Sequence, residues 1–295
     1  MNYFDMIPIE LTQYIFNFTT PYNGLIRLVC KIWSKFVNKI NIQNCAYIAA
    51  NKGQLNVLDY LLKNGCEFNE LVGCEAILGN QFETLQWLLN KFSWDGLKLC
   101  STAAKTGNLL ILQFLHKNQI QWNHFVSIEA AKGGHLELLK WALENGCEYN
   151  LKTWFNAAKY GHLEVLKWAK LKDFTYISHF IIPVGAAQNG HLEVLKWTFE
   201  NGYNLHYITG MAAVKYGHLE VLKWLHIKEC EFNEKTFGSA IIGNHIEILK
   251  WFQENGYHID KYLDSKDDYK IVRDICFKYS RVITNNNCFF NFGYY

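Results

Sequence analysis

The stretch AAKYGHLEVLKW, residues 157–168, is repeated along this chain. Close copies begin at Ala130, Ala186 and Ala213, and looser copies begin at Ala49, Ala76, Ala103 and Ala240. The copies follow one another at intervals of 27 residues, except for one interval of 29 residues between Leu163 and Leu192. A fixed period in this range is typical of solenoids, in which each unit packs only on its neighbours. The sequence therefore predicts a stacked array of eight units over about residues 41–260.

Each unit has the pattern of two short helices joined by a glycine turn. In the fifth unit we expect a helix over Lys152–Tyr160, a turn at Gly161 and a second helix from His162 to about Leu171. In the second helix Glu164 and Lys167 have the i, i+3 spacing of an ion pair on the outer face. Several units then end in Asn-Gly, where glycine fits a left-handed helix C-cap.

Composition limits the classes of partner. Half of the 295 residues are hydrophobic and 16% are aromatic, and the formal net charge is only +2. This balance gives no general case for binding nucleic acid or a membrane surface. We find no signal peptide and no apolar run long enough to span a bilayer. The nine cysteines include no Cys-x-x-Cys pair, so a reduced, cytoplasmic location is expected.

Residues 1–40 do not follow the repeat and predict two short apolar helices, broken near Pro21. This region resembles an F-box. The resemblance is carried by apolar positions and a proline at helical spacing: Ile7, Pro8, Leu11, Ile15, Leu28, Val29 and Trp33. It implies docking on a Skp-type adaptor of a cullin–RING ubiquitin ligase through these residues. The alternative is that the two helices only cap the solenoid.

The repeated units are similar to ankyrin repeats, most of all in the core GHLEVLK. Their period is about six residues shorter than the usual ankyrin unit, and the Thr-Pro-Leu-His hairpin segment is missing, so we expect short or absent β-fingers. Every unit also carries an aromatic residue five positions after the first residue of its second helix. Short units of this kind beside an F-box-like start resemble ankyrin proteins of giant amoeba-infecting DNA viruses, which implies the host cytoplasm as location.

The repeated histidines and aromatic residues invite an interpretation as chemical sites. The histidines lie one full repeat apart, about 10 Å in packed helices, which is too far to share a zinc ion with ligands at about 2 Å. We expect them to hydrogen-bond the backbone near the glycine turn, and we expect the aromatic column to be a buried ladder. No nucleophile motif or phosphate-binding loop is present. We therefore predict no enzyme, no metal and no cofactor.

The most variable positions of the repeat are the two residues before the glycine turn, which in ankyrin-like stacks point toward the concave face. Lysine recurs there, with tyrosine beside it in two units, and the candidate target-binding residues are Lys105, Lys132, Lys159, Tyr160, Lys215 and Tyr216. Such a row would favour an acidic protein segment. The alternative is a solvated helix end.

Taken together, the sequence predicts an all-α, ankyrin-like solenoid of about eight helix-turn-helix repeats. An F-box-like module would precede it at 1–40, and a capping helix and tail would follow at 261–295. The expected function is recruitment of a target protein to a Skp–cullin–F-box ligase. A scaffold or sequestering protein with no ligase attached is the rival.

Overall fold

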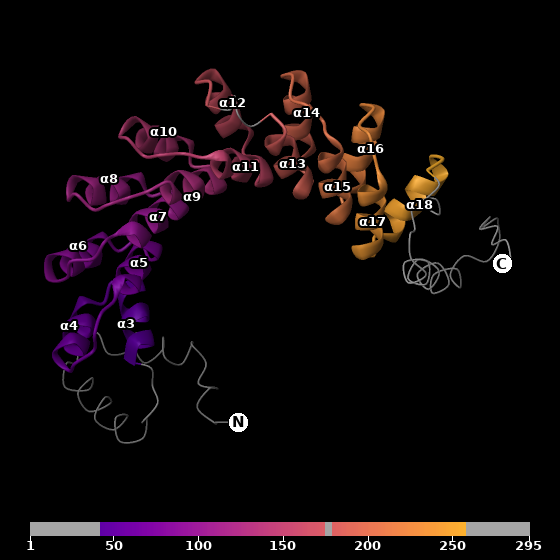
Figure 1. Cartoon of the computed structure of the whole chain (residues 1–295). Helices are drawn as coiled ribbons and strands as arrows, with labels where there is room; N and C mark the ends of the chain where they lie inside the picture. Colours follow the sequence, from indigo (N-terminus) through magenta and orange to yellow (C-terminus); the bar gives the residue numbers. More distant parts are fainter. Residues whose placement is uncertain (1–41, 175–178, 258–295) are drawn as a thin grey trace, which may run out of the picture.

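The computed structural model describes residues 42–174 and 179–257, and in these ranges it contains sixteen α-helices and no strand. The helices form eight pairs that stack into a curved solenoid (Figure 1). The all-α solenoid of about eight repeats is thus confirmed. The F-box-like module, with Ile7, Pro8, Leu11, Ile15, Leu28, Val29 and Trp33, and the C-terminal segment at 261–295 lie outside the described residues.

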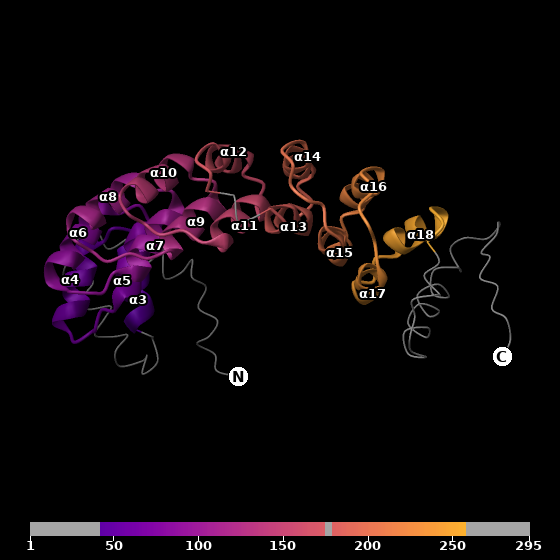
Figure 2. The same ribbon diagram turned by 45° about the horizontal axis from the view of Figure 1, so that its top comes forward.

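The first helix of each pair lies on the inner side of the arc and the second on the outer side (Figure 1). The inner helices are α3 (Ile42–Asn51), α5 (Glu70–Leu78), α7 (Leu97–Thr106), α9 (Phe125–Gly133), α11 (Leu151–Lys159), α13 (Ile181–Gln188), α15 (Tyr207–Lys215) and α17 (Glu234–Ile242). The outer helices are α4 (Leu55–Lys63), α6 (Phe82–Lys91), α8 (Leu109–Lys117), α10 (Leu136–Glu144), α12 (Leu163–Leu171), α14 (Leu192–Glu200), α16 (Leu219–Ile227) and α18 (Ile246–Glu254). A tilted view shows the same two rows, one above the other (Figure 2).

The difference in side-chain size between the two rows accounts for the curvature. Neighbouring inner helices pack directly on one another, and the alanines of the repeated Ala-Ala pair are buried between them, as at Ala157 and Ala158. A Cβ atom added to Gly185 would lie 2.7 Å from the carbonyl oxygen of Phe155, so these backbones approach closely. Each outer helix carries a bulky residue of the aromatic column, where the inner helices carry the Ala-Ala pair. Small residues inside and large residues outside open the stack on its outer side.

The turn between an outer helix and the next inner helix has the predicted left-handed cap. After α4, Gly65 has a φ of +85° and donates its N–H to the carbonyl of Leu62, while Cys66 donates to Leu61. These two bonds form a Schellman motif. The same place is held by non-glycine residues with positive φ in three repeats: Gln119, Asp173 and Glu229. Within the described residues these connections contain no β-finger, as the short period predicts.

The aromatic column is packed but only half-buried, which corrects the expectation of a buried ladder. Trp168 and Trp197 lie against the core and contact an aromatic ring of the following connection, Phe174 and Tyr203 respectively. Their other side remains accessible because the outer helices spread apart. The largest fully buried side chain is instead Trp154 on inner helix α11, with 1% exposure.

Candidate functional site

The predicted target-binding residues occupy the last turn of inner helices α7, α9, α11 and α15, or the residue that follows it. Lys105 and Lys215 are exposed, and Lys132 and Lys159 are half-buried. Tyr160 and Tyr216 expose 39% and 45% of their surface. Since inner helices of successive repeats pack side by side, these positions form a row along the concave side, which we call the lysine row: Lys105, Lys132, Lys159, Gln188 and Lys215.

The structure brings members of the row into contact across repeat boundaries. The Nζ atom of Lys132 lies 5.8 Å from the ring centre of Tyr160, within the range of a cation–π contact. Gln188, which interrupts the lysines, donates its side-chain amide to the hydroxyl of Tyr216 at 2.6 Å. The two tyrosines therefore reach back toward the preceding row member and join neighbouring repeats.

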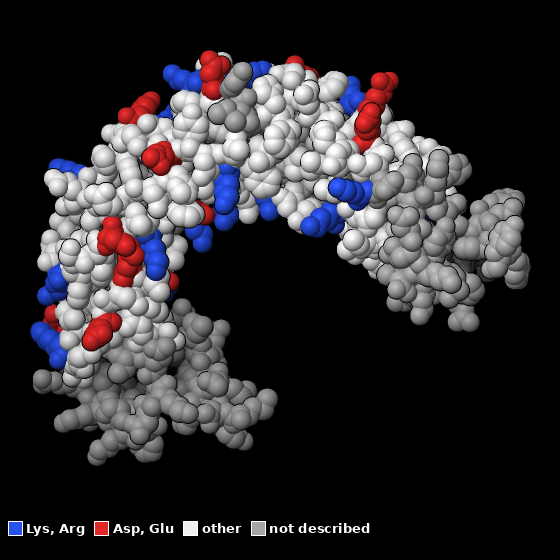
Figure 3. Space-filling model, viewed as in Figure 1, with Lys and Arg blue, Asp and Glu red and all other residues white. Residues whose placement is uncertain are grey.

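Charge is distributed unequally between the two sides of the arc. Inner helices α7, α9, α11, α13 and α15 together carry six lysines and one acidic residue, Glu129. The outer helices α8, α10, α12, α14 and α16 carry six lysines and six glutamates. Lysine side chains accordingly gather along the inner edge over the middle of the arc, whereas both signs alternate along the outer edge (Figure 3). The concave side is thus locally basic in a chain that is nearly neutral.

Ion pairing follows the same division. On the outer helices the predicted i, i+3 pairs are present, for example Glu164–Lys167 at 2.7 Å. On the concave side Lys132 lies 3.7 Å from Glu129, too long for a hydrogen bond. Within the described part of the chain, Lys105, Lys159 and Lys215 have no carboxylate at ion-pair distance. Their charges are available to a ligand.

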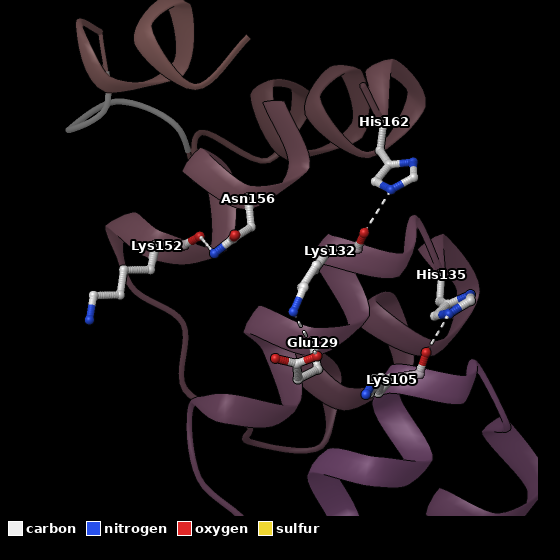
Figure 4. Close-up of polar contacts among 7 residues, drawn as sticks. All are labelled: Lys105, Glu129, Lys132, His135, Lys152, Asn156 and His162. Atoms are coloured by element: carbon white, nitrogen blue, oxygen red, sulfur yellow. Dashed lines mark hydrogen bonds and ion pairs between the residues drawn. The ribbon is translucent and has the colours of Figure 1, made fainter. Parts of the chain in front are cut away.

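A ladder of histidines fixes the backbone of the lysine row. The Nε2 atom of His135 lies 3.1 Å from the carbonyl oxygen of Lys105, and that of His162 lies 2.8 Å from the carbonyl oxygen of Lys132 (Figure 4). Later repeats continue the ladder through His191–Lys159, His218–Gln188 and His245–Lys215. A carbonyl oxygen can only accept, so Nε2–H is the donor. Each imidazole satisfies a carbonyl left free at the end of an inner helix.

The expected histidine–backbone bond is therefore present, but its partner belongs to the preceding repeat rather than to the histidine's own turn. Each residue of the lysine row thus has two roles. Its backbone carbonyl accepts a hydrogen bond from the histidine of the next repeat, while its side chain projects into the concave space. Burial lowers the pKa of His191, and the neighbouring His162 and His218 add to this effect. The neutral imidazole is therefore favoured at His191.

The other titratable groups give no sign of chemistry in the described residues. No group of three or more His, Cys, Asp or Glu residues that could hold a metal ion occurs there. Burial raises the pKa of the Cys100 thiol to about 12, and raises those of Cys147 and Cys230 to about 11. These thiols stay protonated at neutral pH and are poor nucleophiles. They are buried and belong to the hydrophobic core.

A family model agrees with this architecture. The family model for ankyrin repeats (many copies) matches residues 186–226, from α13 to α16. The solenoid is built of ankyrin-like repeats. The chain is also similar to the crystal structure of the human ASB11 ankyrin repeat domain, with 17% identity, a TM-score of 0.41, and coverage of 63% of this chain and 84% of that chain. No curated protein matches the chain. Among the described residues, no helix is long and apolar enough to cross a membrane.

Sequence reasoning missed the aromatic residues of the connections. Trp122 stacks on His116 with ring centres 4.4 Å apart and also contacts Trp141 of the next outer helix. Phe174 and Tyr203 contact the tryptophan of their own repeat, Trp168 and Trp197 respectively. The signal was available, because an apolar or aromatic residue recurs shortly after each second helix. Its role became visible only when neighbouring repeats were placed side by side.

Proposed function

We propose that this protein is a protein-interaction module that binds an acidic segment of a partner along its concave side. The supporting observation is the charge distribution, since six lysines and one glutamate line the inner helices of the middle repeats while the outer helices are balanced. Exposed ion pairs contribute only about 0.2–1 kcal/mol each. Binding through the lysine row must therefore be cumulative and must weaken as salt increases.

A charge-reversal experiment tests this proposal. The variant Lys132→Glu/Lys159→Glu/Lys215→Glu should retain the helical fold and lose the partner proteins that the wild type captures from a cell extract. The matched control reverses three lysines of the outer helices: Lys140, Lys167 and Lys223. Both variants change the net charge by the same amount, so only the location of the charge differs. Equal loss of partners by both variants, or retention by the concave variant at physiological salt, would disprove the proposal.

We further propose that the module recruits its partner to a ubiquitin ligase. The support is the F-box resemblance of residues 1–40, in which Ile7, Pro8, Leu11, Ile15, Leu28, Val29 and Trp33 would contact a Skp-type adaptor held by a cullin. Replacing Leu28 and Val29 with charged residues should abolish adaptor binding and leave the repeats folded. Unfolding of the repeats in this variant would instead assign both residues to an N-terminal cap.

The rival proposal is a scaffold or sequestering protein with no link to a ligase. Both proposals place the protein in the cytoplasm with a protein partner, and neither requires nucleic acid, a membrane or a cofactor. Affinity purification of the full chain separates them. Recovery of a Skp-type adaptor together with a cullin supports the ligase, and recovery of the concave-side partner without these two supports the scaffold.

A further inference from the structure

Three positions of the array depart from the repeat pattern and lie close together. Leu78 occupies the repeat position that Lys105 and Lys132 occupy in the following two repeats. Asn108 stands where the later repeats have histidine, and Leu110 stands where they have glutamate. Leu78 exposes 45% of its surface and Leu110 exposes 75%. Leu78 and Leu110 therefore leave apolar surface in contact with water where other repeats have a lysine and a glutamate.

The three departures border one hollow of about 540 Å³ at the junction of the second and third repeats. Its lining comes from the ends of α5 and α7 and the start of α8: Ile77, Leu78, Asn80, Thr106, Gly107, Asn108, Leu109 and Leu110. Thr106 directly follows Lys105, the first lysine of the lysine row. The hollow therefore lies at one end of the basic row.

The hollow lies at a junction where the repeat has asparagine, Asn108, in place of the histidine of the ladder. At the five later junctions an imidazole lies against the turn glycine of the preceding repeat, as His135 lies against Gly107. At the junction of the second and third repeats the left-handed turn residue is Asn80, with a φ of +54°. Its side-chain oxygen accepts a hydrogen bond from the side-chain amide of Asn108 at 2.7 Å. This pair of short amides replaces the glycine–imidazole contact, and it fills less space than a ring.

We propose that the hollow takes a large apolar side chain at one end of the acidic segment that the lysine row binds. This inference rests on the proposed function and specifies the partner's sequence. Packed helices lie about 10 Å apart, and an extended peptide advances about 3.3 Å per residue. One acidic residue in every third position therefore matches Lys105, Lys132 and Lys159. The recognised motif is an apolar residue followed by acidic residues at intervals of three, ending where Gln188 interrupts the row.

Synthetic peptides test the motif on the full-length protein. The probe is a fluorescent peptide with the sequence Phe-Gly-Ser-Glu-Gly-Ser-Glu-Gly-Ser-Glu. A second peptide has the reverse sequence, because the lysine row does not determine in which direction the bound peptide runs. Two controls replace the phenylalanine with alanine or place the three glutamates consecutively. Burial of an aromatic side chain should tighten binding about tenfold or more over the alanine peptide, measured by fluorescence anisotropy at low salt. Consecutive glutamates should bind less tightly than spaced ones.

Variants that restore the repeat pattern test the hollow without threatening the fold. Leu110→Glu installs the residue found at this position in five later repeats, where it is mostly exposed. Asn80→Gly/Asn108→His installs the glycine–imidazole contact, since histidine alone would meet the Cβ atom of Asn80. Both variants should remove the advantage of the phenylalanine peptide. The matched control is Leu171→Glu, the same change at a residue that is 83% exposed on α12 and distant from the hollow.

The possible outcomes separate this inference from the proposed function. If the phenylalanine advantage survives in either hollow variant, or if the wild type shows no advantage with both peptide orders, the hollow does not bind the apolar residue. If the phenylalanine and alanine peptides both lose binding in the Lys132→Glu/Lys159→Glu/Lys215→Glu variant in that case, the proposed acidic partner still stands. If no acidic peptide binds the wild type at low salt, the acidic partner and this inference are both wrong.

Discussion

The histidine ladder gives a quantitative prediction for the middle of the array. His162→Ala removes the hydrogen bond to the carbonyl of Lys132 at 2.8 Å, which contributes about 1 kcal/mol net. It also removes the ring from the turn of the preceding repeat, where it lies against Gly134. We expect a total loss of about 2 kcal/mol in the free energy of unfolding, measured by urea denaturation with tryptophan fluorescence.

A double-mutant cycle with Gly134 tests the geometry behind this number. Gly134 has a φ of +71°, and a Cβ atom there would overlap the Nδ1 atom of His162. Gly134→Ala should therefore cost about 1 kcal/mol for the left-handed backbone and a further ~1–2 kcal/mol for displacing the ring. In the His162→Ala background only the first cost remains.

The cycle should thus show a coupling energy of about 1 kcal/mol or more between the two sites, whereas independent substitutions add to within about 0.5 kcal/mol. Additive effects, with the same urea m-value for all four proteins, would show that the ring does not pack on this turn. The account of the ladder, and of the hollow that its absence creates, would then be wrong.

Three further predictions follow from the described contacts. Glu229→Gly should stabilise the protein by about 0.5–1 kcal/mol by relieving a φ of +57°. Gly146→Glu, at an equivalent cap with open space around its Cβ position, should destabilise it, and a higher melting temperature for Gly146→Glu than for Glu229→Gly would contradict this. Trp154→Ala should cost about 3–5 kcal/mol because its side chain is fully buried, and Trp168→Ala should cost less because its side chain is only partly buried. Equal losses on urea denaturation would argue against the spread of the outer helices. Burial lowers the folded-state pKa of His191 below its ordinary value of 6.5. The unfolded chain therefore binds more protons near that pH, so stability should fall as pH decreases below about 6.5. His191→Asn should show a shallower fall in stability between pH 7.5 and 5.5, and a pH profile identical to that of the wild type would exclude His191 as the cause.

The repeat period alone determined the fold. Spacing of 27 residues, a glycine turn and an apolar stripe can be satisfied only by short helix pairs that bury their faces against neighbours. Helix caps and ion pairs within one helix could also be predicted from the sequence, because they depend on residues three to six positions apart. The left-handed glycine at Gly65 and the Glu164–Lys167 pair were therefore both expected and both found.

Relations between repeats required the tertiary structure. Residues about 30 positions apart, such as His162 and Lys132, meet only because one repeat is superposed on the next with a particular offset. The sequence shows that histidine recurs, but it does not show which carbonyl lies within reach. It also does not show that the outer helices spread far enough to leave Trp168 only partly buried, since curvature depends on how closely the inner helices approach.

The lysine row could be predicted in part from the sequence, whereas the hollow required the tertiary structure. The positions of Lys105, Lys132, Lys159 and Lys215 were read from the repeat, because equivalent residues of a stack must lie in line. The isolation of Lys105, Lys159 and Lys215 from carboxylates in the described part of the chain, and the meeting of Leu78, Asn108 and Leu110 around one hollow, depended on the packing of helices from two repeats. A periodic sequence determines which residues are equivalent, whereas the packing of neighbouring repeats determines which of them are in contact.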